Sequence, residues 1–126
     1  MSNCYIYASS DTHSTAIHLP HELEGCNWQI GLCEISYGKT KTTFPVTDVC
    51  CDIITPNFKN GLSSQILRRV AACKNAVDMR FNPVYYHNVM STNVRDLNIY
   101  LKSDKHKIES FTGISLNCTL HLRKHE

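Results

Sequence analysis

The sequence predicts an all-β protein, folded as a two-sheet antiparallel sandwich of the single jelly-roll type with about eight strands. Three observations lead to this fold class. Short segments with strand character recur along the 126 residues at the spacing typical of a sandwich. The connections are long, without a run of tight hairpins, which favours Greek-key or jelly-roll wiring. An immunoglobulin topology is disfavoured because Cys26 lies only two residues before Trp28, so no Cys-Trp-Cys pattern of suitable spacing exists.

Length and composition bound the domain organisation and the compartment. With 126 residues, 42% of them hydrophobic, we expect one domain over 1–126 with a real core. No apolar run approaches the roughly 18–20 residues that a membrane-spanning helix needs. The opening MSNCYIYASSDT has neither the basic nor the apolar region of a signal peptide. We therefore expect no membrane partner and a protein assembled inside the cell, in the cytoplasm or nucleus.

Three strands are expected in the N-terminal third. Residues 5–7 add an edge strand, and a short alternating strand over 15–19 is ended by Pro20. In 27–37 the apolar positions shift phase by one residue beside Gly31, which is what a β-bulge produces. These apolar positions are Trp28, Ile30 and Leu32 before the shift and Cys33, Ile35 and Tyr37 after it.

Two strands and one ambiguous segment are expected in the middle. In 48–55, apolar residues occupy both odd and even positions, which predicts a strand buried on both faces. We expect Pro56 to end it. Residues 79–89 are rich in aromatic and branched side chains, and Pro83 suggests an edge or bulge position there.

The segment 63–77 is the place where the pattern favours a helix. Apolar residues recur there at helical intervals, and Ser63 is available as an N-cap. Its first half, QILRRV, also fits a strand with Arg68 and Arg69 on opposite faces. On pattern alone we expect one short helix.

The last two strands have the clearest signal. Residues 96–102 alternate apolar and polar, and 114–124 do so strictly over eleven residues. The connection between them is too long for a tight hairpin, so these strands need not be neighbours. On the final strand the apolar face is Ile114, Leu116, Cys118, Leu120 and Leu122, opposite Ser115, Asn117, Thr119, His121 and Arg123.

The seven cysteines are an odd number, so they cannot all pair within one chain. None forms a C-x-x-C, which leaves a structural zinc site without support. We expect reduced thiols that serve mainly as small apolar residues. Core-compatible positions are Cys33, Cys118 and one of Cys50 and Cys51, whereas Cys4, Cys26 and Cys73 fall near strand ends or in loops.

No catalytic or metal-binding constellation stands out. A cupin-type metal site needs two His at alternate positions of one strand, whereas His18 and His21 are three apart. His121 and His125 would lie roughly 13 Å apart along a strand. Nucleophile motifs and glycine-rich phosphate loops are absent. We expect no enzyme activity, no metal and no cofactor; a cupin-like metalloenzyme is the disfavoured alternative.

Nucleic acid is a weakly supported partner. The net charge is only +2, and basic groups such as Arg68-Arg69 and Arg123-Lys124 have acidic neighbours. Solvated strand ends are the default interpretation of these groups. Contact with nucleic acid or an acidic partner remains the weaker alternative.

Three stretches carry motifs that occur together in a known family. They are LPHELEGCNWQIGLCEISYG, VCCDIITPNFKNGLSSQILRRV, and a C-terminal stretch with the pair Tyr85-Tyr86, Phe111-x-Gly113 and the closing Thr-Leu-His-x-Arg of 119–123. Together they resemble a protein family carried by Polinton/Maverick-type elements and adintovirus-like double-stranded DNA viruses. This chain differs in having a shorter region between Tyr37 and Val49 and a Lys-rich turn at 103–108.

The resemblance implies a single-jelly-roll structural protein, similar to a penton or minor capsid component, that resides in the virion. It also favours a strand over 63–77. Such a protein is expected to self-associate in a closed ring, a pentamer or trimer, and to contact other capsid proteins. A non-capsid jelly-roll binding module, such as a trimeric ligand or host-interaction protein, is the alternative. Because aromatic residues and Arg are enriched at interfaces, the candidate assembly residues are Tyr85, Tyr86, Tyr100, His121 and Arg123, which equally fit ordinary solvent-facing positions.

Overall fold

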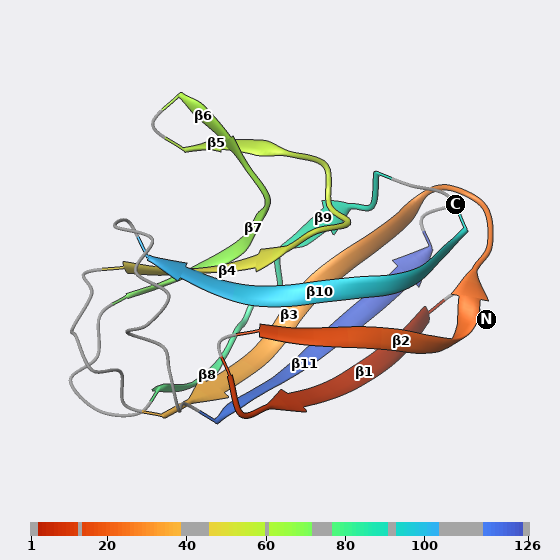
Figure 1. The fold of residues 1–126 in the computed structure, drawn as a ribbon. Helices are drawn as coiled ribbons and strands as arrows, with labels where there is room; N and C mark the ends of the chain where they lie inside the picture. The colour runs from red at the N-terminus through yellow and green to blue at the C-terminus, as the bar shows by residue number, and fades with distance from the viewer. Residues whose placement is uncertain are drawn as a thin grey trace.

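The computed structural model describes residues 3–12, 14–38, 46–59, 61–71, 77–90, 93–103 and 115–124. Within these ranges the chain forms antiparallel strands and no helix, arranged as two facing sheets (Figure 1). The first sheet has the order β1 (Asn3–Ser10), β11 (Leu116–Lys124), β3 (Trp28–Tyr37) and β8 (Val77–Arg80), with β9 (Tyr86–Asn88) also paired to β3. The second has the order β2 (Ser14–Leu23), β10 (Val94–Ser103), β4 (Val46–Cys51) and β7 (Ile66–Ala71). A separate hairpin joins β5 (Asn57–Lys59) and β6 (Leu62–Ser64).

This strand order is the wiring of a jelly roll. Apart from the hairpin and β9, every step along the chain crosses from one sheet to the other, except the step from β4 to its neighbour β7. Strands that are adjacent in space are therefore distant in sequence, as in a pair of Greek keys. The predicted two-sheet jelly roll of about eight strands is confirmed.

The core lies between the two sheets and is filled by alternate residues of each strand. Leu116, Leu120 and Leu122 of β11 are fully buried and face Ile99 and Leu101 of β10 across the sandwich. The alternation predicted for both strands is confirmed, and the two lie in different sheets. Of the predicted final strand, Ile114 lies outside the described residues. No described helix is long and apolar enough to span a bilayer.

The predicted bulge in β3 is present. Pairing with β11 moves from Glu34 opposite Thr119 to Leu32 opposite Leu120, so Cys33 is an extra residue in β3. The bulge shifts the alternation of side chains by one residue, so that both Leu32 and Ile35 point into the core and are buried. Cys33 itself is only half-buried, so its expected core position is wrong.

The helix favoured by the pattern of 63–77 is wrong: the described part is strand, with 72–76 outside the described residues. β7 contains a bulge against β4, where the register shifts between Val49 and Cys50. Because of this extra residue, Leu67 and Val70 both face the core although they are three apart. A bulged strand therefore produced the helical spacing.

Pro20 does not end the second strand, because β2 continues to Leu23. β2 is the edge of its sheet, where a missing backbone N–H costs little. Its pairing with β10 is irregular opposite this proline, and Arg95 donates hydrogen bonds to the carbonyls of Leu19 and Pro20, both at 3.2 Å. The edge position thus tolerates a residue that would stop a central strand.

The remaining elements follow the sequence closely. β1 is an edge strand, as expected for 5–7. β4 is almost entirely buried, as predicted for 48–55, but it runs from Val46 to Cys51. The predicted end at Pro56 is wrong, because the chain already turns at 52–53. The strand expected over 79–89 is divided into β8 and β9, and Pro83 lies in the connection between them. Both are edge elements that pair with different parts of β3.

Candidate assembly surface

A single row of paired residues crosses the outer face of the first sheet. Tyr5 of β1 is paired with His121 of β11, His121 with Gly31 of β3, and Gly31 with Tyr86 of β9. Side chains at paired positions share one face of a sheet, so these residues are neighbours there. The row contains three rings and one position without a side chain.

The missing side chain at Gly31 allows Tyr86 to reach His121. A Cβ at position 31 would lie 3.1 Å from the Tyr86 ring and 2.6 Å from Cγ1 of Val84. The Tyr86 hydroxyl forms a hydrogen bond of 2.8 Å with Nδ1 of His121. From the other neighbouring strand, the Tyr5 ring stacks on the imidazole with centroids 4.5 Å apart. His121 is therefore held between two tyrosines.

Arg123 extends this arrangement to the next row of the same face. Its guanidinium carbon lies 3.5 Å from the centre of the Tyr86 ring, a cation–π contact. Its Nε donates to Oε1 of Gln29 at 3.0 Å, and Nε2 of Gln29 donates to Oδ1 of Asn88 at 3.1 Å. Four strands are thus connected through side chains on one outer face.

The electrostatics of this cluster favour a neutral imidazole. Burial and the positive charge of Arg123 lower the pKa of His121 from its ordinary value. Burial raises the pKa of Tyr86, partly offset by the same guanidinium. The only formal charge within the cluster at neutral pH is therefore that of Arg123.

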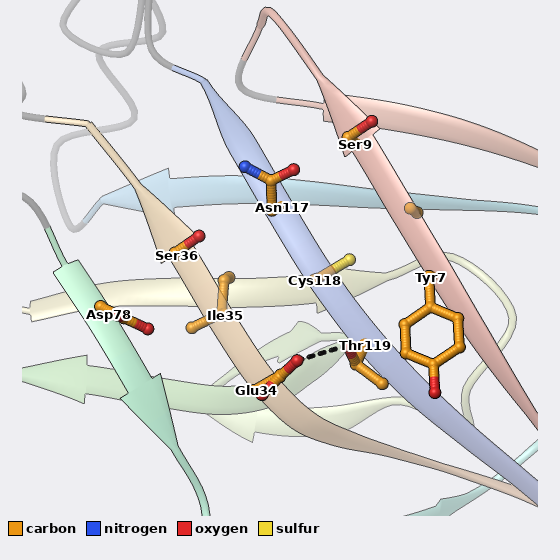
Figure 2. Close-up of a pocket in the computed structure, with 10 residues that line it drawn as sticks. Tyr7, Ser9, Glu34, Ile35, Ser36, Asp78, Asn117, Cys118 and Thr119 are labelled. Carbon is orange, nitrogen blue, oxygen red and sulfur yellow. Dashed lines mark hydrogen bonds between the residues drawn. The ribbon is translucent and has the colours of Figure 1, made fainter.

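Beside this cluster the outer face is hollowed into a shallow polar depression of about 340 Å³. Figure 2 shows Tyr7 on one side and Asp78 on the other, with Glu34 and Thr119 between them. Glu34 accepts hydrogen bonds from Oγ1 of Thr119 at 2.9 Å and from Nε of Arg80 at 3.2 Å. Two of the lining side chains, Glu34 and Thr119, are thus bonded to each other, and most of the lining residues are polar.

The structure brings together three of the five sequence-predicted assembly residues, namely Tyr86, His121 and Arg123. Tyr85 lies under the guanidinium of Arg68, whose carbon is 3.7 Å from the ring centre. Tyr100 is in the other sheet, paired with Cys50 and partly buried, and this burial raises its pKa.

Two residues of β1 belong to the same face but were not among the predicted site residues. They are Tyr5, which stacks on His121, and Tyr7. Their side chains are 59% and 77% exposed. The signal for them was present, since Tyr5 and Tyr7 occupy alternate positions of an expected edge strand.

The cysteines form no reactive or metal-binding cluster in the described part of the chain. Six of the seven are described, all as free thiols, and Cys73 lies outside the described residues. Burial raises the pKa of Cys51 to about 12 and that of Cys118 to about 11, so both are protonated and poorly nucleophilic. Cys51 is the member of the adjacent pair that joins the core, while Cys4 packs against its margin.

No group of three His, Cys, Asp or Glu side chains converges among the described residues. Of the two histidines weighed as a metal pair, His18 contacts Oδ1 of Asp96 at 2.6 Å through Nδ1. Both side chains are largely exposed, as expected for a polar surface pair. His125 lies outside the described residues.

Comparisons with known proteins give a likeness in structure but none in sequence. No family model and no curated protein matches the sequence. The structure resembles that of the mavirus penton protein with a TM-score of 0.73, covering 99% of this chain and 100% of that chain at 6% identity. A family two carbohydrate esterase from Cellvibrio japonicus aligns over 98% of this chain and 34% of its own, at 14% identity, but its TM-score of 0.24 carries no argument. The chain thus shares the fold of the mavirus penton protein along its whole length.

Proposed function

We propose that this chain is a structural, penton-like capsid subunit of a virus or virus-derived element, and that it works by self-association and not by catalysis. The observation that carries the proposal is the whole-length likeness to the mavirus penton protein. Fold alone is a weak guide to function. The resemblance of three sequence stretches to Polinton/Maverick-type proteins and the character of one outer face add support.

The proposed contact surface is the cluster of Tyr5, Tyr86, His121 and Arg123, hereafter the aromatic row. Tyrosine and arginine are the residue types that dominate binding energy at interfaces. Stacking, the Tyr86–His121 hydrogen bond and the Arg123 cation–π contact order these side chains before any partner binds. Little side-chain entropy is then lost on docking, which favours association. Tyr85 and Tyr100 lie apart from this row and are secondary candidates.

The partners we propose are further copies of the chain in a closed ring, a pentamer or trimer, and other capsid proteins, with the assembled ring residing in the virion. A closed ring follows when the same pair of unlike surfaces is used by every subunit and the rotation closes. We also propose that residues 1–126 act as a single domain. Nucleic acid is the weaker partner hypothesis, because the net charge is only +2.

The test is the solution mass of the full chain, measured by light scattering and native mass spectrometry over a wide concentration range. Five 14.3 kDa chains give about 72 kDa and three give about 43 kDa. Arg123→Glu is expected to reduce ring formation, because it replaces the cation of the aromatic row by an anion. Glu22→Lys, a charge reversal at an exposed position of the other sheet, is the control and should assemble normally.

A strictly monomeric chain at high concentration would count against the proposal. The second arm co-expresses the chain with the other capsid proteins of its genome and images the products by electron microscopy. Particles that contain the chain support the proposal. If neither rings nor particles form, the capsid role is wrong, and the non-capsid binding module becomes the working hypothesis.

A further inference from the structure

The two open edges of the sandwich differ. At the edge formed by β7 and the β8–β9 connection, side chains bridge the two sheets. Arg68 donates from Nη1 to the carbonyl of Pro83 at 2.9 Å, and its guanidinium lies over the rings of Phe81 and Tyr85. Nε2 of His87 contacts the carbonyl of Leu67 at 2.8 Å. This edge is sealed by the chain itself.

At the opposite edge, β1 and β2 lie side by side (Figure 1). A groove of about 590 Å³ there reaches residues of the core. Its walls include the side chains of Leu19, Leu23 and Trp28, which belong to the buried core cluster. Cys4 and Ile6 of β1 border it and are only partly buried. The groove is therefore apolar at its base. Its rim carries His21, Glu22, Glu24 and Lys124.

β1 itself lacks the features by which edge strands avoid pairing with other chains, which are charges, proline, bulges and short length. The other edge strands of the two sheets have them, and β9 is only three residues long. β2 contains Pro20 and an irregular register, β7 contains two arginines, and β8 is four residues long with Asp78 and Arg80. β1 has eight residues, NCYIYASS, with no charge and no proline. Among the described strands it pairs only with β11, so its other side has no strand partner.

We propose that β1 and the adjoining groove bind an extended segment of another polypeptide, which adds to the first sheet as a further strand. Main-chain hydrogen bonds to the free side of β1 would hold the segment, as in β-strand addition generally. In a strand paired with β1, every second side chain lies on the face of Cys4 and Ile6 and so points toward the groove. The site therefore selects bulky apolar residues at alternate positions.

The charges of the rim add a second element of selectivity. Among the described lining residues, two carboxylates, Glu22 and Glu24, stand against the ammonium of Lys124, whose Nζ is already 3.4 Å from the carbonyl of Glu24. A basic residue next to the apolar alternation is therefore favoured. A second copy's β1 fits poorly, because its core-facing side chains, Cys4, Ile6 and Ala8, are too small to fill the groove. This site shares β1 with the proposed assembly surface, since Tyr5 lines the groove as well as stacking on His121. Its apolar base lies on the core side of the sheet, whereas His121 and Arg123 lie on the outer face.

The test selects a phage library of random twelve-residue peptides on the full chain and measures the affinity of the enriched peptides. We expect sequences that alternate bulky apolar and other residues with a Lys or Arg beside the alternation. Ile6→Lys should weaken their binding at least about tenfold. Met79→Lys is the matched control, since Met79 also points toward the core from an edge strand of the same sheet and is 38% exposed.

Two further measurements keep the test independent of folding effects and of capsid assembly. Bound peptide should slow alkylation of Cys4, which borders the groove, but not of exposed Cys26. The surface variant Glu22→Lys/Glu24→Lys should remove the preference for a basic residue. Three outcomes would overturn the proposal. They are enriched peptides without the alternation, equal peptide binding by Ile6→Lys and Met79→Lys, and a chain that binds no peptide but self-associates in a way that Ile6→Lys abolishes. Arg123→Glu, which tests ring formation, should leave peptide binding unchanged.

Discussion

Gly31 shows how one residue without a side chain organises a surface. It is paired with His121 of β11 on one side and with Tyr86 of β9 on the other, and so separates these two members of the aromatic row. Any β-carbon there would meet Val84 and the backbone of Tyr85 as well as the Tyr86 ring. The close approach of β9 to β3, and with it the Tyr86–His121 contact, therefore depends on glycine at this position.

Gly31→Ala is expected to lower the free energy of unfolding by about 1–3 kcal/mol, because backbone and side-chain neighbours must move. Chemical denaturation followed by the fluorescence of Trp28 measures this change. Gly38→Ala is the control, since a Cβ there meets nothing closer than 3.9 Å and should be nearly neutral. Equal stability of the two variants would contradict this account of the row.

The protonation of His121 gives a second residue-level prediction. Its pKa in the folded chain is lowered by burial and by Arg123, so the unfolded chain binds the proton more readily. The stabilisation from the neutral imidazole is therefore fully present above its ordinary pKa of about 6.5 and is lost as the pH falls through the lower folded value. The wild-type chain should lose more stability between neutral and mildly acidic pH than His121→Gln.

The measurement is the unfolding free energy of both proteins across this pH range. Only the difference between them reports on His121, because the other histidines are shared. Parallel curves would show that His121 titrates as it does in the unfolded chain.

At the scale of elements, bulges decide which side chains reach the core. The extra residue at Cys33 keeps both halves of β3 on the core face, and the extra residue in β7 does the same for Leu67 and Val70. A bulge changes the spacing of apolar residues from two to three, which resembles a helical interval over a short window. The first case could be predicted because a single phase shift separated two clean alternations.

Edge elements also rely on particular side chains, and Arg68 is the clearest example. Arg68→Ala removes the hydrogen bond to Pro83 and the cation–π contacts with Phe81 and Tyr85. We expect a loss of about 1.5–3.5 kcal/mol in unfolding free energy, since the hydrogen bond contributes about 0.5–1.5 kcal/mol and each cation–π contact about 0.5–1 kcal/mol. Hydrogen exchange should accelerate first at the backbone amides of β8 and β9.

Arg80→Ala is the matched control for this prediction. Arg80 is 87% exposed and pairs with the partly exposed Glu34, an arrangement that typically contributes about 0–1 kcal/mol. A larger effect of Arg80→Ala than of Arg68→Ala would show that the β7 edge is not sealed as described.

For the whole molecule, the facing sheets enclose thiols that report on opening of the sandwich. Cys51 and Cys118 enter the core from opposite sheets, and burial raises the pKa of both. We expect iodoacetamide to modify exposed Cys26 quickly and these two only when the sheets separate. Their modification rates, measured by mass spectrometry, should rise together with denaturant and follow global unfolding. Rapid modification of either in the native chain would contradict the closed core.

The sequence by itself determined the elements whose signal is local. Strict alternation predicted the outward and inward faces of β10 and β11, the long connections predicted jelly-roll wiring, and a single phase shift predicted the bulge in β3. These properties arise from the two-residue period of a strand, which is readable within ten residues.

Only the tertiary structure decided which faces and edges lie together. Tyr86 and His121 are 35 positions apart, and their contact depends on the register of three strands and on the glycine between them. Tyr100 has an equally suitable residue type but belongs to the other sheet. The strand at 66–71 and the continuation of β2 past Pro20 were likewise set by their places in the sheets. Register and sheet membership are long-range properties, because the packing of the whole core selects them and no short segment encodes them.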